Sequence, residues 1–313
     1  MSTAITYTAV GGPEVLTATE IDTPAARAGE VAVRIEAVGV NPIDAKLRSG
    51  KRPSPPITAP RGVGSDAAGV VTAVGEGVEG FRVGDTVVVF GATGAYATDL
   101  VTTPEHLEPR PPQVSAAQGA ALGVPVGTAY QTVRSLAVGA HDTVLVHGGS
   151  GSVGQAVIQF AVLAGARVIA TTSDRRAARV AELGATPIPY GDGVVARVRE
   201  LAPDSVTVAI DLAGTDEALA QSIELVADKT RIATLVRGAD AAGLGIRAFI
   251  GGSPVPLTAA EQAWRAEAMP VTIALMAAGA FSVDLGPELP LTDAAEAHRL
   301  VEAGTDGKIV LVP

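Results

Sequence analysis

The length, composition and charge of the chain exclude several classes of protein. Its 313 residues carry a formal net charge of -10 and are 47% hydrophobic, so a nucleic-acid partner, which needs a basic surface, is not expected. The sequence contains no cysteine, which excludes disulfides, thiolate nucleophiles and cysteine-ligated zinc. A chain of this length usually divides into domains, and we expect two.

The N-terminal third of the sequence contains short runs of residues that are rich in valine. From Ile5 to about Gly91, apolar runs rich in β-branched residues alternate with glycine, proline and aspartate, a pattern typical of strands between turns. The clearest runs are Glu30–Glu36, Gly69–Val74 and Asp85–Phe90. We therefore expect a first domain that is mostly β.

From Thr143 the pattern changes to a strand, a glycine turn and a helix in repetition. The expected strands are Thr143–His147, Arg167–Thr172, Thr186–Pro189, Val206–Asp211, Arg231–Val236 and Leu244–Ile250, with helices at Val153–Leu163 and Arg175–Leu183. Strands that alternate with helices pair in parallel through right-handed crossovers. The sequence thus predicts an α/β fold with a doubly wound parallel sheet.

The C-terminal part of the sequence begins with a long apolar helical stretch. We expect a helix over Ala259–Ala278, then the segment Leu285–Pro290, a short helix over Asp293–Ala303 and a closing strand over Lys308–Val312. No signal-peptide pattern and no apolar run of ~18 residues is present, so we expect a cytoplasmic protein that does not contact a membrane.

A glycine-rich loop follows the strand Thr143–His147. Gly149-Ser-Gly-Ser-Val-Gly154 fits the pattern G-x-G-x-x-G and opens an apolar helix. Glycines permit a tight turn and close approach of the backbone to a pyrophosphate, while free N–H groups and the helix dipole attract the anion. In this context the motif predicts dinucleotide binding through Gly149, Ser150, Gly151, Ser152, Val153 and Gly154.

The end of the next strand indicates which coenzyme binds. An acid at this point accepts a hydrogen bond from the ribose 2′-OH of NAD and repels the 2′-phosphate of NADP. Thr172 and Ser173 stand here, and Arg175 and Arg176, which follow, are suited to a phosphate. The pattern favours NADPH. Two interpretations of Asp174 stay open: it caps the next helix while both arginines are solvated, or its carboxylate enters the pocket and weakens the preference.

Several further segments together carry a family resemblance. Asn41-Pro-Ile-Asp44-Ala-Lys-Leu-Arg48-Ser-Gly50 has the form N-x-x-D-x-x-x-R-x-G. Similar signatures lie in Gly64–Gly69, Gly75–Asp85, Thr128–Tyr130, Leu183–Ala185 and Gly307–Val310. Over nearly its whole length the chain resembles the zinc-free medium-chain dehydrogenases/reductases, and among them the quinone oxidoreductases of the zeta-crystallin-like group.

The resemblance implies a fold, domain limits and site residues. It implies a GroES-like catalytic domain over residues 1–123 and 256–313, and a Rossmann NADPH-binding domain over residues 124–255. Asn41 and Thr128 would be catalytic and would also contact the coenzyme. The other coenzyme-binding residues that it implies are Tyr190, Ala213, Leu235, Val236, Phe249, Ile250 and Lys308.

The resemblance also bears on metals and substrates. The zinc alcohol dehydrogenases of the superfamily hold zinc with cysteines that are missing here, and His106, His141, His147 and His298 have no ligand spacing, so we expect no metal. Without zinc the simplest reaction is hydride transfer from NADPH to a quinone or enone, which conjugation already activates. The quinone oxidoreductases commonly carry tyrosines where Lys46 and Arg52 stand, and these two side chains are candidate contacts for an anionic substrate.

Other interpretations of the same residues stay open. In one interpretation the Asn41 side chain serves only to cap the helix that follows it. Asp44 and Arg48 stand four residues apart, where a structural ion pair is favoured over direct chemistry. None of the four tyrosines is a convincing proton donor.

Two alternative functions also stay open. An enoyl-thioester reductase would favour a tyrosine near residue 52, where this chain has arginine, and a non-enzymatic NADPH-binding protein would share the same fold. We expect a homodimer in which the strand Leu244–Ile250 pairs across a two-fold axis, with a small-molecule electron acceptor as the other partner.

Overall fold

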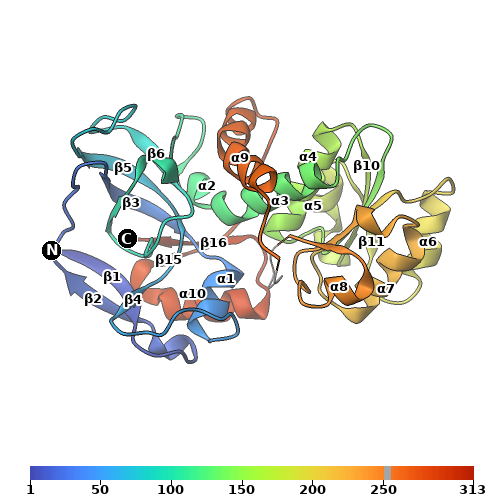
Figure 1. The fold of residues 1–313 in the computed structure, drawn as a ribbon, viewed down its shortest axis with the longest axis horizontal. Helices are drawn as coiled ribbons and strands as arrows, with labels where there is room; N and C mark the ends of the chain where they lie inside the picture. The colour runs from blue at the N-terminus through green and yellow to red at the C-terminus, as the bar shows by residue number, and fades with distance from the viewer. Residues whose placement is uncertain (250–254) are drawn as a thin grey trace. The chain divides into compact units, whose positions relative to one another are not determined.

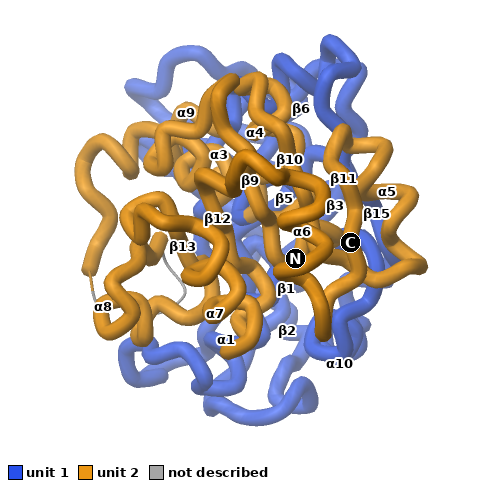
Figure 2. The backbone as a smooth tube through the Cα atoms, turned by 90° about the vertical axis from the view of Figure 1, so that its right-hand side faces the viewer, with its two compact units in different colours: residues 1–124, 269–313 blue, residues 125–268 orange. Residues whose placement is uncertain are grey.

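The computed structural model describes residues 1–249 and 255–313, and its contacts divide the chain into two compact units (Figure 2). Unit 1 comprises residues 1–124 and 269–313, and unit 2 comprises residues 125–268. The second limit falls inside a helix, whereas the sequence-based limits are 123/124 and 255/256. No helix among the described residues is long and apolar enough to cross a membrane.

Unit 1 is built on two sheets (Figure 1). A three-stranded sheet has the order β2-β1-β4, and a seven-stranded sheet has the order β15-β16-β3-β5-β6-β8, with β7 also paired to β3. The strands are β1 (Ser2–Tyr7), β2 (Thr17–Ile21), β3 (Val31–Gly39), β4 (Arg61–Gly62), β5 (Asp66–Val74), β6 (Thr86–Val89), β7 (Asp99–Thr102), β8 (Leu107–Pro109), β15 (Leu285–Pro290) and β16 (Lys308–Val312). The expected β-rich first domain is confirmed.

The core of unit 1 joins segments from both ends of the chain. Val31, Val33 and Ile35 of β3 pack with Ile309 and Leu311 of β16 in one apolar cluster. The pairing of β16 with β3 is antiparallel, so the closing strand completes the N-terminal sheet. The helices of this unit are α1 (Pro42–Arg48), α2 (Ala116–Ala120) and α10 (Ala294–Ala303), and α3 (Gly123–Ser135) begins in it.

Unit 2 contains the expected doubly wound parallel sheet. Its strand order is β11-β10-β9-β12-β13-β14 and every pairing is parallel. The order reverses between β9 and β12, which is the switch point where such sheets bind ligands. The strands are β9 (Thr143–His147), β10 (Arg167–Thr172), β11 (Thr186–Pro189), β12 (Val208–Asp211), β13 (Ile232–Thr234) and β14 (Arg247–Ala248).

Helices connect these strands. They are α4 (Ser152–Leu163), α5 (Ala177–Glu182), α6 (Val194–Leu201), α7 (Asp216–Leu225) and α8 (Ala241–Leu244); the long α9 (Ala259–Ala277) follows the sheet. In Figure 1, α4 lies beside β10 and α7 lies on the other side of unit 2, near α8. Apolar side chains of α6, α7 and α8 pack in one cluster with the strand residues Leu145, Ile169, Ile188, Ala209 and Ile232.

The last strand of unit 2 differs from the expectation. The sequence predicted a strand over Leu244–Ile250, but Leu244 ends α8 and only Arg247–Ala248 form β14. The reason is Gly245, which has a φ of 72° and ends the short helix in the left-handed conformation. Ile250 lies outside the described residues.

Candidate functional site

The glycine-rich loop joins β9 to α4 at the switch point of the parallel sheet. The N–H of Gly149 donates to the carbonyl of Thr171 at 3.0 Å, and the N–H of Gly148 donates to Oγ1 of Thr171 at 3.1 Å. These bonds hold the loop against β10. Gly151 is the N-cap of α4, so the first-turn N–H groups of that helix have no acceptor within the helix and point out of its N-terminus.

Close packing explains two of the glycines. A Cβ on Gly149 would lie 2.6 Å from the Cβ of Ala170, and a Cβ on Gly154 would lie 2.3 Å from the carbonyl oxygen of Gly148. Gly151 differs, because the nearest atom to a Cβ there is 3.8 Å away. Gly149 and Gly154 therefore shape the loop, while Gly151 leaves open space at the helix end.

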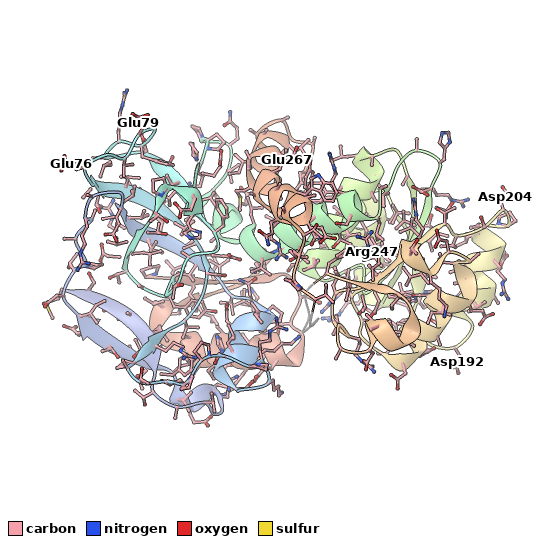
Figure 3. The ribbon with its side chains drawn as sticks, viewed as in Figure 1. Glu76, Glu79, Asp192, Asp204, Arg247 and Glu267 are labelled. Atoms are coloured by element: carbon pink, nitrogen blue, oxygen red, sulfur yellow. The ribbon has the colours of Figure 1, made fainter. Side chains whose placement is uncertain are left out.

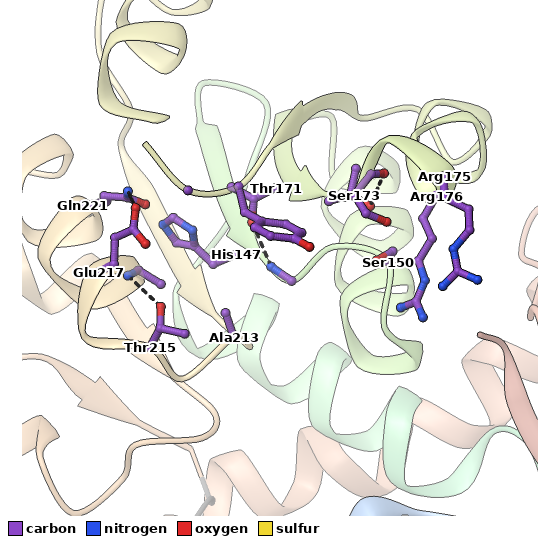
Figure 4. A pocket seen from close by; sticks show the side chains of 15 residues that line it. His147, Ser150, Thr171, Ser173, Arg175, Arg176, Ala213, Thr215, Glu217 and Gln221 are labelled. Carbon is purple, nitrogen blue, oxygen red and sulfur yellow. Dashed lines mark hydrogen bonds between the residues drawn. The ribbon is translucent and has the colours of Figure 1, made fainter. Parts of the chain in front are cut away.

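A cavity of about 510 Å³ lies beside this loop (Figure 4). Its lining comes from His147, Gly148, Ser150, Thr171, Thr172, Ser173, Arg175, Arg176, Tyr190, Gly191, Ala213, Thr215, Glu217, Ala218 and Gln221. In the figure, His147, Glu217 and Gln221 gather at one end and the two arginines at the other. The cavity is of the size that binds small organic ligands.

The arginine end of the cavity is suited to a phosphate. Thr172 is buried at the end of β10, and Ser173 precedes the short turn that carries Arg175 and Arg176. Asp174 is not the helix cap that one interpretation required, since Ser173 holds the N-cap position of the turn. Asp174 is also absent from the cavity lining. Among the lining residues at this end, the charged groups are therefore both cationic.

Buried polar side chains hold the neighbouring loops. Asp211 ends β12 with no exposed surface, and its carboxylate accepts from the N–H groups of Ala213 and Gly214 at 3.0 and 2.9 Å and from Oγ1 of Thr234 at 2.8 Å. Oγ1 of Thr234 in turn accepts from the N–H of Val236 at 3.2 Å. The loops after β12 and β13 are thus tied to one carboxylate.

His147 stands beside Asp211 in the parallel register of β9 and β12. Its ring is 2% exposed, and Nε2 has no hydrogen-bond partner among the described residues. Burial lowers the pKa of His147 to about 4, and the carboxylate of Asp211 opposes this shift. His147 is therefore neutral at physiological pH.

Thr128 and Phe249 are each held by an arginine of unit 2. Oγ1 of Thr128, in α3, accepts from Arg265 of α9 at 2.7 Å. The guanidinium of Arg247, labelled in Figure 3, lies 4.6 Å from the ring centre of Phe249. Thr128 is 8% exposed and Phe249 is 2% exposed, so both side chains are buried.

Asn41 belongs to a buried polar cluster in unit 1. Its Nδ2 donates to Oδ2 of Asp66 at 2.8 Å, and Nζ of Lys308 donates to its Oδ1. The polar cluster comprises Asn41, Asp44, Asp66, Tyr96, His298 and Lys308, each buried. Asn41 is also the N-cap residue of α1, but its side chain reaches well beyond the helix that it begins.

Asp44 has a strongly perturbed environment in this cluster. Its Oδ2 accepts from the N–H of Asn41 at 2.9 Å and from the hydroxyl of Tyr96 at 3.0 Å. Burial raises the pKa of Asp44 to about 7, and the like charge of Asp66 adds to the rise. Burial also raises the pKa of Tyr96 well above its ordinary value and lowers that of Lys308.

The ion pair expected between Asp44 and Arg48 does not form. Nη2 of Arg48 instead donates to Oε1 of Glu302 at 2.6 Å, and Nη1 donates to the carbonyl of Gly11 at 2.6 Å. Asp44 is instead directed into the polar cluster, where Asn41 and Tyr96 donate to it. Helical spacing alone did not reveal a partner 254 residues away in sequence.

Lys46 and Arg52 lie near each other at the end of α1. The N–H of Arg52 donates to the carbonyl of Lys46 at 3.0 Å, which closes the loop. The side chain of Lys46 is exposed and that of Arg52 is half-buried. Both belong to unit 1, as do Asn41 and Lys308.

The predicted coenzyme residues fall into three groups. Those that line the cavity are Ser150, Thr172, Ser173, Arg175, Arg176, Tyr190 and Ala213. Gly149, Gly151, Ser152, Val153 and Gly154 form the adjoining loop and helix start. The third group lies outside the lining: Thr128, Leu235, Val236 and Phe249 belong to unit 2, Asn41 and Lys308 belong to unit 1, and Ile250 is not described.

Sequence reasoning missed several lining residues. His147 ends β9, while Thr215, Glu217, Ala218 and Gln221 belong to the start of α7 after β12. Ligands bind at the carboxyl ends of parallel strands. Applied to every strand of the sheet, that rule indicates His147 and Thr215.

In residues 1–249 and 255–313, no group of three or more histidine, aspartate or glutamate side chains is arranged to hold a metal ion. The two buried histidines, His147 and His298, lie in different units.

Comparison with known proteins places the chain in a family. Residues 27–147 match the alcohol dehydrogenase GroES-like domain, and residues 152–249 match the domain described as zinc-binding dehydrogenase. A quinone oxidoreductase from Salmonella typhimurium is 33% identical over 100% of both chains.

Solved structures agree with this match. A quinone oxidoreductase from Pseudomonas syringae pv. tomato superposes with a TM-score of 0.85 at 30% identity, over 100% of both chains. The Escherichia coli quinone oxidoreductase complexed with NADPH superposes with a TM-score of 0.84 at 29% identity, over 99% of this chain and 100% of that one. The chain belongs to the quinone oxidoreductase family of the medium-chain dehydrogenases/reductases, with a GroES-like domain and a Rossmann-type domain.

Proposed function

We propose that this oxidoreductase transfers hydride from NADPH to a quinone or to another electron-poor conjugated carbonyl, without zinc. The observation that carries the proposal is the cavity beside the glycine-rich loop, where Ser173, Arg175 and Arg176 occupy the place at which an NAD enzyme carries an acid. A relative of the same fold was solved in complex with NADPH.

The residues present fit the coenzyme. The space that Gly151 leaves at the N-terminus of α4 admits a pyrophosphate, which the first-turn N–H groups and the helix dipole would bind. Arg175 and Arg176 supply charge-assisted hydrogen bonds to a 2′-phosphate, and the exposed ring of Tyr190 lines the cavity near them. NADPH, when bound, supplies a hydride from its reduced nicotinamide ring.

The family resemblance assigns further residues to the nicotinamide half. Asn41 and Thr128 would contact the nicotinamide and its ribose, together with Lys308 and the loops that contain Ala213, Leu235, Val236, Phe249 and Ile250. The hydrogen bonds of Asp211 and Thr234 hold two of these loops in place. Preorganised loops lower the entropy cost of binding a long ligand.

If no metal ion polarises the carbonyl group of the acceptor, the acceptor itself must be reactive enough to take up a hydride. A quinone or enone meets this need because conjugation spreads the negative charge that develops after hydride transfer. Lys46 and Arg52, which a backbone hydrogen bond brings together, would favour an acceptor with an anionic group. The side chain of Lys46 is exposed and therefore accessible to a ligand.

The test is oxidation of NADPH and NADH by the purified protein, with a metal chelator present throughout. The panel contains a neutral quinone, a carboxylated quinone, an enone and an enoyl thioester. We expect chelator-resistant NADPH oxidation with a quinone or enone, faster than with NADH. Turnover of the enoyl thioester alone would favour the other reductase class, and NADPH binding without any turnover would favour a non-enzymatic role.

We also propose a homodimer. β14 is the edge strand of the parallel sheet, and an edge strand offers unpaired backbone groups that a second copy would satisfy. Light scattering would give twice the mass of 31.3 kDa. A monomeric mass at micromolar concentration would contradict this assignment.

A further inference from the structure

The Asn41 side chain is held between a carboxylate and an ammonium group. Its Nδ2 lies 2.8 Å from Oδ2 of Asp66, and its Oδ1 accepts from Nζ of Lys308. Asn41 and Asp66 are 1% exposed and Lys308 is 4% exposed. All three side chains are therefore withdrawn from bulk solvent, and their hydrogen bonds are strong in this environment.

The two partners determine which end of the amide is which. A carboxylate only accepts hydrogen bonds and an ammonium only donates them, so the NH₂ group must face Asp66 and the oxygen must face Lys308. The second hydrogen of Nδ2 lies toward the carbonyl of Gly39 at 3.4 Å. Both hydrogens of the amide are thus directed at protein acceptors, so Oδ1, whose side chain also takes part in the capping box with Asp44, is the atom of the amide that is able to accept a further hydrogen bond.

The surroundings of this amide leave its partners little freedom. Asp66 also accepts from the N–H of Val124 at 2.7 Å and from Oγ of Ser65 at 3.1 Å. A Cβ on Gly123 would lie 2.1 Å from Oδ1 of Asp66, and a Cβ on Gly39 would lie 1.9 Å from the carbonyl oxygen of Ala120. Glycine at both positions is what lets the chain close around the carboxylate and the amide.

Burying these charges costs free energy. An isolated buried carboxylate or ammonium is strongly unfavourable, and apolar side chains of similar volume often replace a buried charged group without loss of stability. Here the carboxylate and the ammonium are bridged by one neutral amide, and no ion pair within 4.0 Å joins them among the described residues. We therefore interpret the buried Asp66 and Lys308 side chains as groups that orient the Asn41 amide, and not as groups that stabilise the fold.

We propose that Asp66 and Lys308 are positioning residues that lock the Asn41 amide in one orientation, so that Asn41 offers the coenzyme a hydrogen-bond acceptor and no donor. This inference rests on the proposed contact of Asn41 with the nicotinamide half of NADPH. The group that Asn41 recognises is then a donor, either a ribose hydroxyl or the N–H of the carboxamide. Asn41 would orient the coenzyme and would not stabilise a developing oxyanion on the acceptor, which needs a donor.

The first test observes the lock directly. Asn41 is the only asparagine in the sequence, so labelling asparagine with ¹⁵N at Nδ2 gives one side-chain NH₂ signal pair. We expect both protons to be protected from exchange in the free protein, at least about tenfold more than in Lys308→Met, which keeps the single asparagine. The proton bonded to Asp66 should keep its protection when NADPH is added. Loss of that protection on binding would show that Asn41 donates to the coenzyme, and would overturn the inference.

An analogue of the coenzyme separates the two candidate donors. Reduced 3-acetylpyridine adenine dinucleotide phosphate lacks the carboxamide N–H. If the Asn41 signals shift equally with this analogue and with NADPH, the donor is a ribose hydroxyl; if the shift disappears, the donor is the carboxamide. If neither NADPH nor the analogue moves the signals although both bind, Asn41 does not contact the nicotinamide half and the inference fails.

The second test exchanges the polarity of the contact. In Asn41→Asp two carboxylates face each other, and in Asp66→Asn two amides do, so each single variant should bind NADPH about tenfold more weakly. In the double variant the amide at position 66 donates to the carboxylate at position 41, which still offers an acceptor to the coenzyme. We expect the double variant to bind at least about threefold more tightly than either single variant, with partial recovery because the N–H of Val124 loses an acceptor.

The controls separate this inference from the proposed function. Asp85→Asn removes a carboxylate that accepts only from a turn N–H, that of Arg82 at 2.7 Å, and should bind NADPH as the unaltered protein does. Adenosine 2′,5′-bisphosphate, which lacks the nicotinamide half, should bind all variants equally. If the double variant has the unfolding midpoint of the unaltered protein but binds NADPH no better than the weaker single variant, the lock is refuted. If the unaltered protein binds no NADPH, the proposed function fails while exchange protection in the free protein still tests the lock.

Discussion

The coenzyme cavity of unit 2 and the polar cluster of unit 1 are built in contrasting ways. The cavity is lined by residues between His147 and Gln221, and at the end proposed for phosphate binding two arginine side chains lie on a short turn. The polar cluster joins side chains from Asn41 to Lys308, and each of its members is buried. One region is open and sequence-local, and the other is closed and assembled from distant segments.

This contrast predicts how each region responds to substitution. Changes in the cavity should alter affinity with little effect on stability, because several of the lining side chains, Arg175 and Tyr190 among them, are exposed to solvent. Changes in the cluster should alter stability and its pH dependence, because each buried group depends on the others. Three substitutions test this division, from the largest expected effect to the smallest.

The largest effect is expected for Gly151→Asp. The position has room for a side chain, since a Cβ would have no atom nearer than 3.8 Å, and aspartate is a favoured N-cap residue. The protein should therefore keep its unfolding midpoint. Its carboxylate would occupy the place of the pyrophosphate, and we expect NADPH to bind at least about 1,000-fold more weakly, or about 4 kcal/mol. Titration of coenzyme fluorescence measures the loss.

Gly151→Asn is the matched control for that substitution. Asparagine has the same shape and is an equally good N-cap, but it carries no charge. The asparagine variant should bind NADPH more tightly than the aspartate variant does. The difference between their binding free energies gives the electrostatic contribution to the loss of affinity. Equal losses in the two variants would mean that bulk and not charge excludes the coenzyme.

The second effect concerns the pH dependence of unit 1. The pKa of Asp44 is about 7 in the folded protein, against 3.8 for the free carboxyl, mainly because the group is buried. A raised pKa in the folded state contributes stability that is complete below pH ~4 and is lost as pH rises through 7. Asp44→Asn removes this titration, and its carbonyl oxygen is able to accept both bonds that Oδ2 now accepts.

The difference in unfolding free energy between Asp44→Asn and the unaltered protein should therefore shift in favour of the variant by about 3 kcal/mol between pH 5 and pH 9. Urea unfolding at both pH values measures it. Glu76→Gln on the same unit is the control, because that exposed side chain has no buried partner. A pH-independent difference would show that Asp44 titrates normally in the folded protein.

The sequence predicted most of the fold because its signals are local. Valine-rich runs between turns and the strand–glycine–helix repeat depend on neighbouring residues, and β11 and β16 were placed with their observed bounds. The strand expected over Leu244–Ile250 was too long, because Ala241–Leu244 form a short helix that ends at Gly245, and only Arg247–Ala248 form β14.

In the candidate site, too, the features that depend on neighbouring residues were predictable and the contacts between distant residues were not. The glycine-rich loop and the arginines follow from spacing, and they lie at the cavity. The Asp44–Arg48 ion pair was wrong because Glu302 outcompetes Asp44 for Arg48 from 254 residues away. The partners of Asn41 are likewise remote, at positions 66 and 308, and no local pattern in one sequence indicates which distant segments pack together.

The smallest of the three effects is expected for the double substitution Arg175→Ala with Arg176→Ala. Both side chains line the cavity, and a charge-assisted hydrogen bond contributes about 1.5 to 3 kcal/mol. We expect the preference for NADPH over NADH to fall about 30-fold, or about 2 kcal/mol, with the affinity for NADH nearly unchanged. Parallel titrations with the two coenzymes measure the ratio.

Arg199→Ala is the control for the arginine pair, because Arg199 forms an exposed ion pair with Glu224 at 3.0 Å and lies outside the cavity lining. Exposed pairs of this kind contribute little, so its preference for NADPH should match that of the unaltered protein. A double variant that keeps its full NADPH preference would assign the 2′-phosphate to other groups, and Ser150, Thr172 and Ser173 are polar lining residues of the cavity that remain as candidates. Selectivity would then arise from neutral hydrogen bonds, and raising the salt concentration would change it less than charge recognition requires.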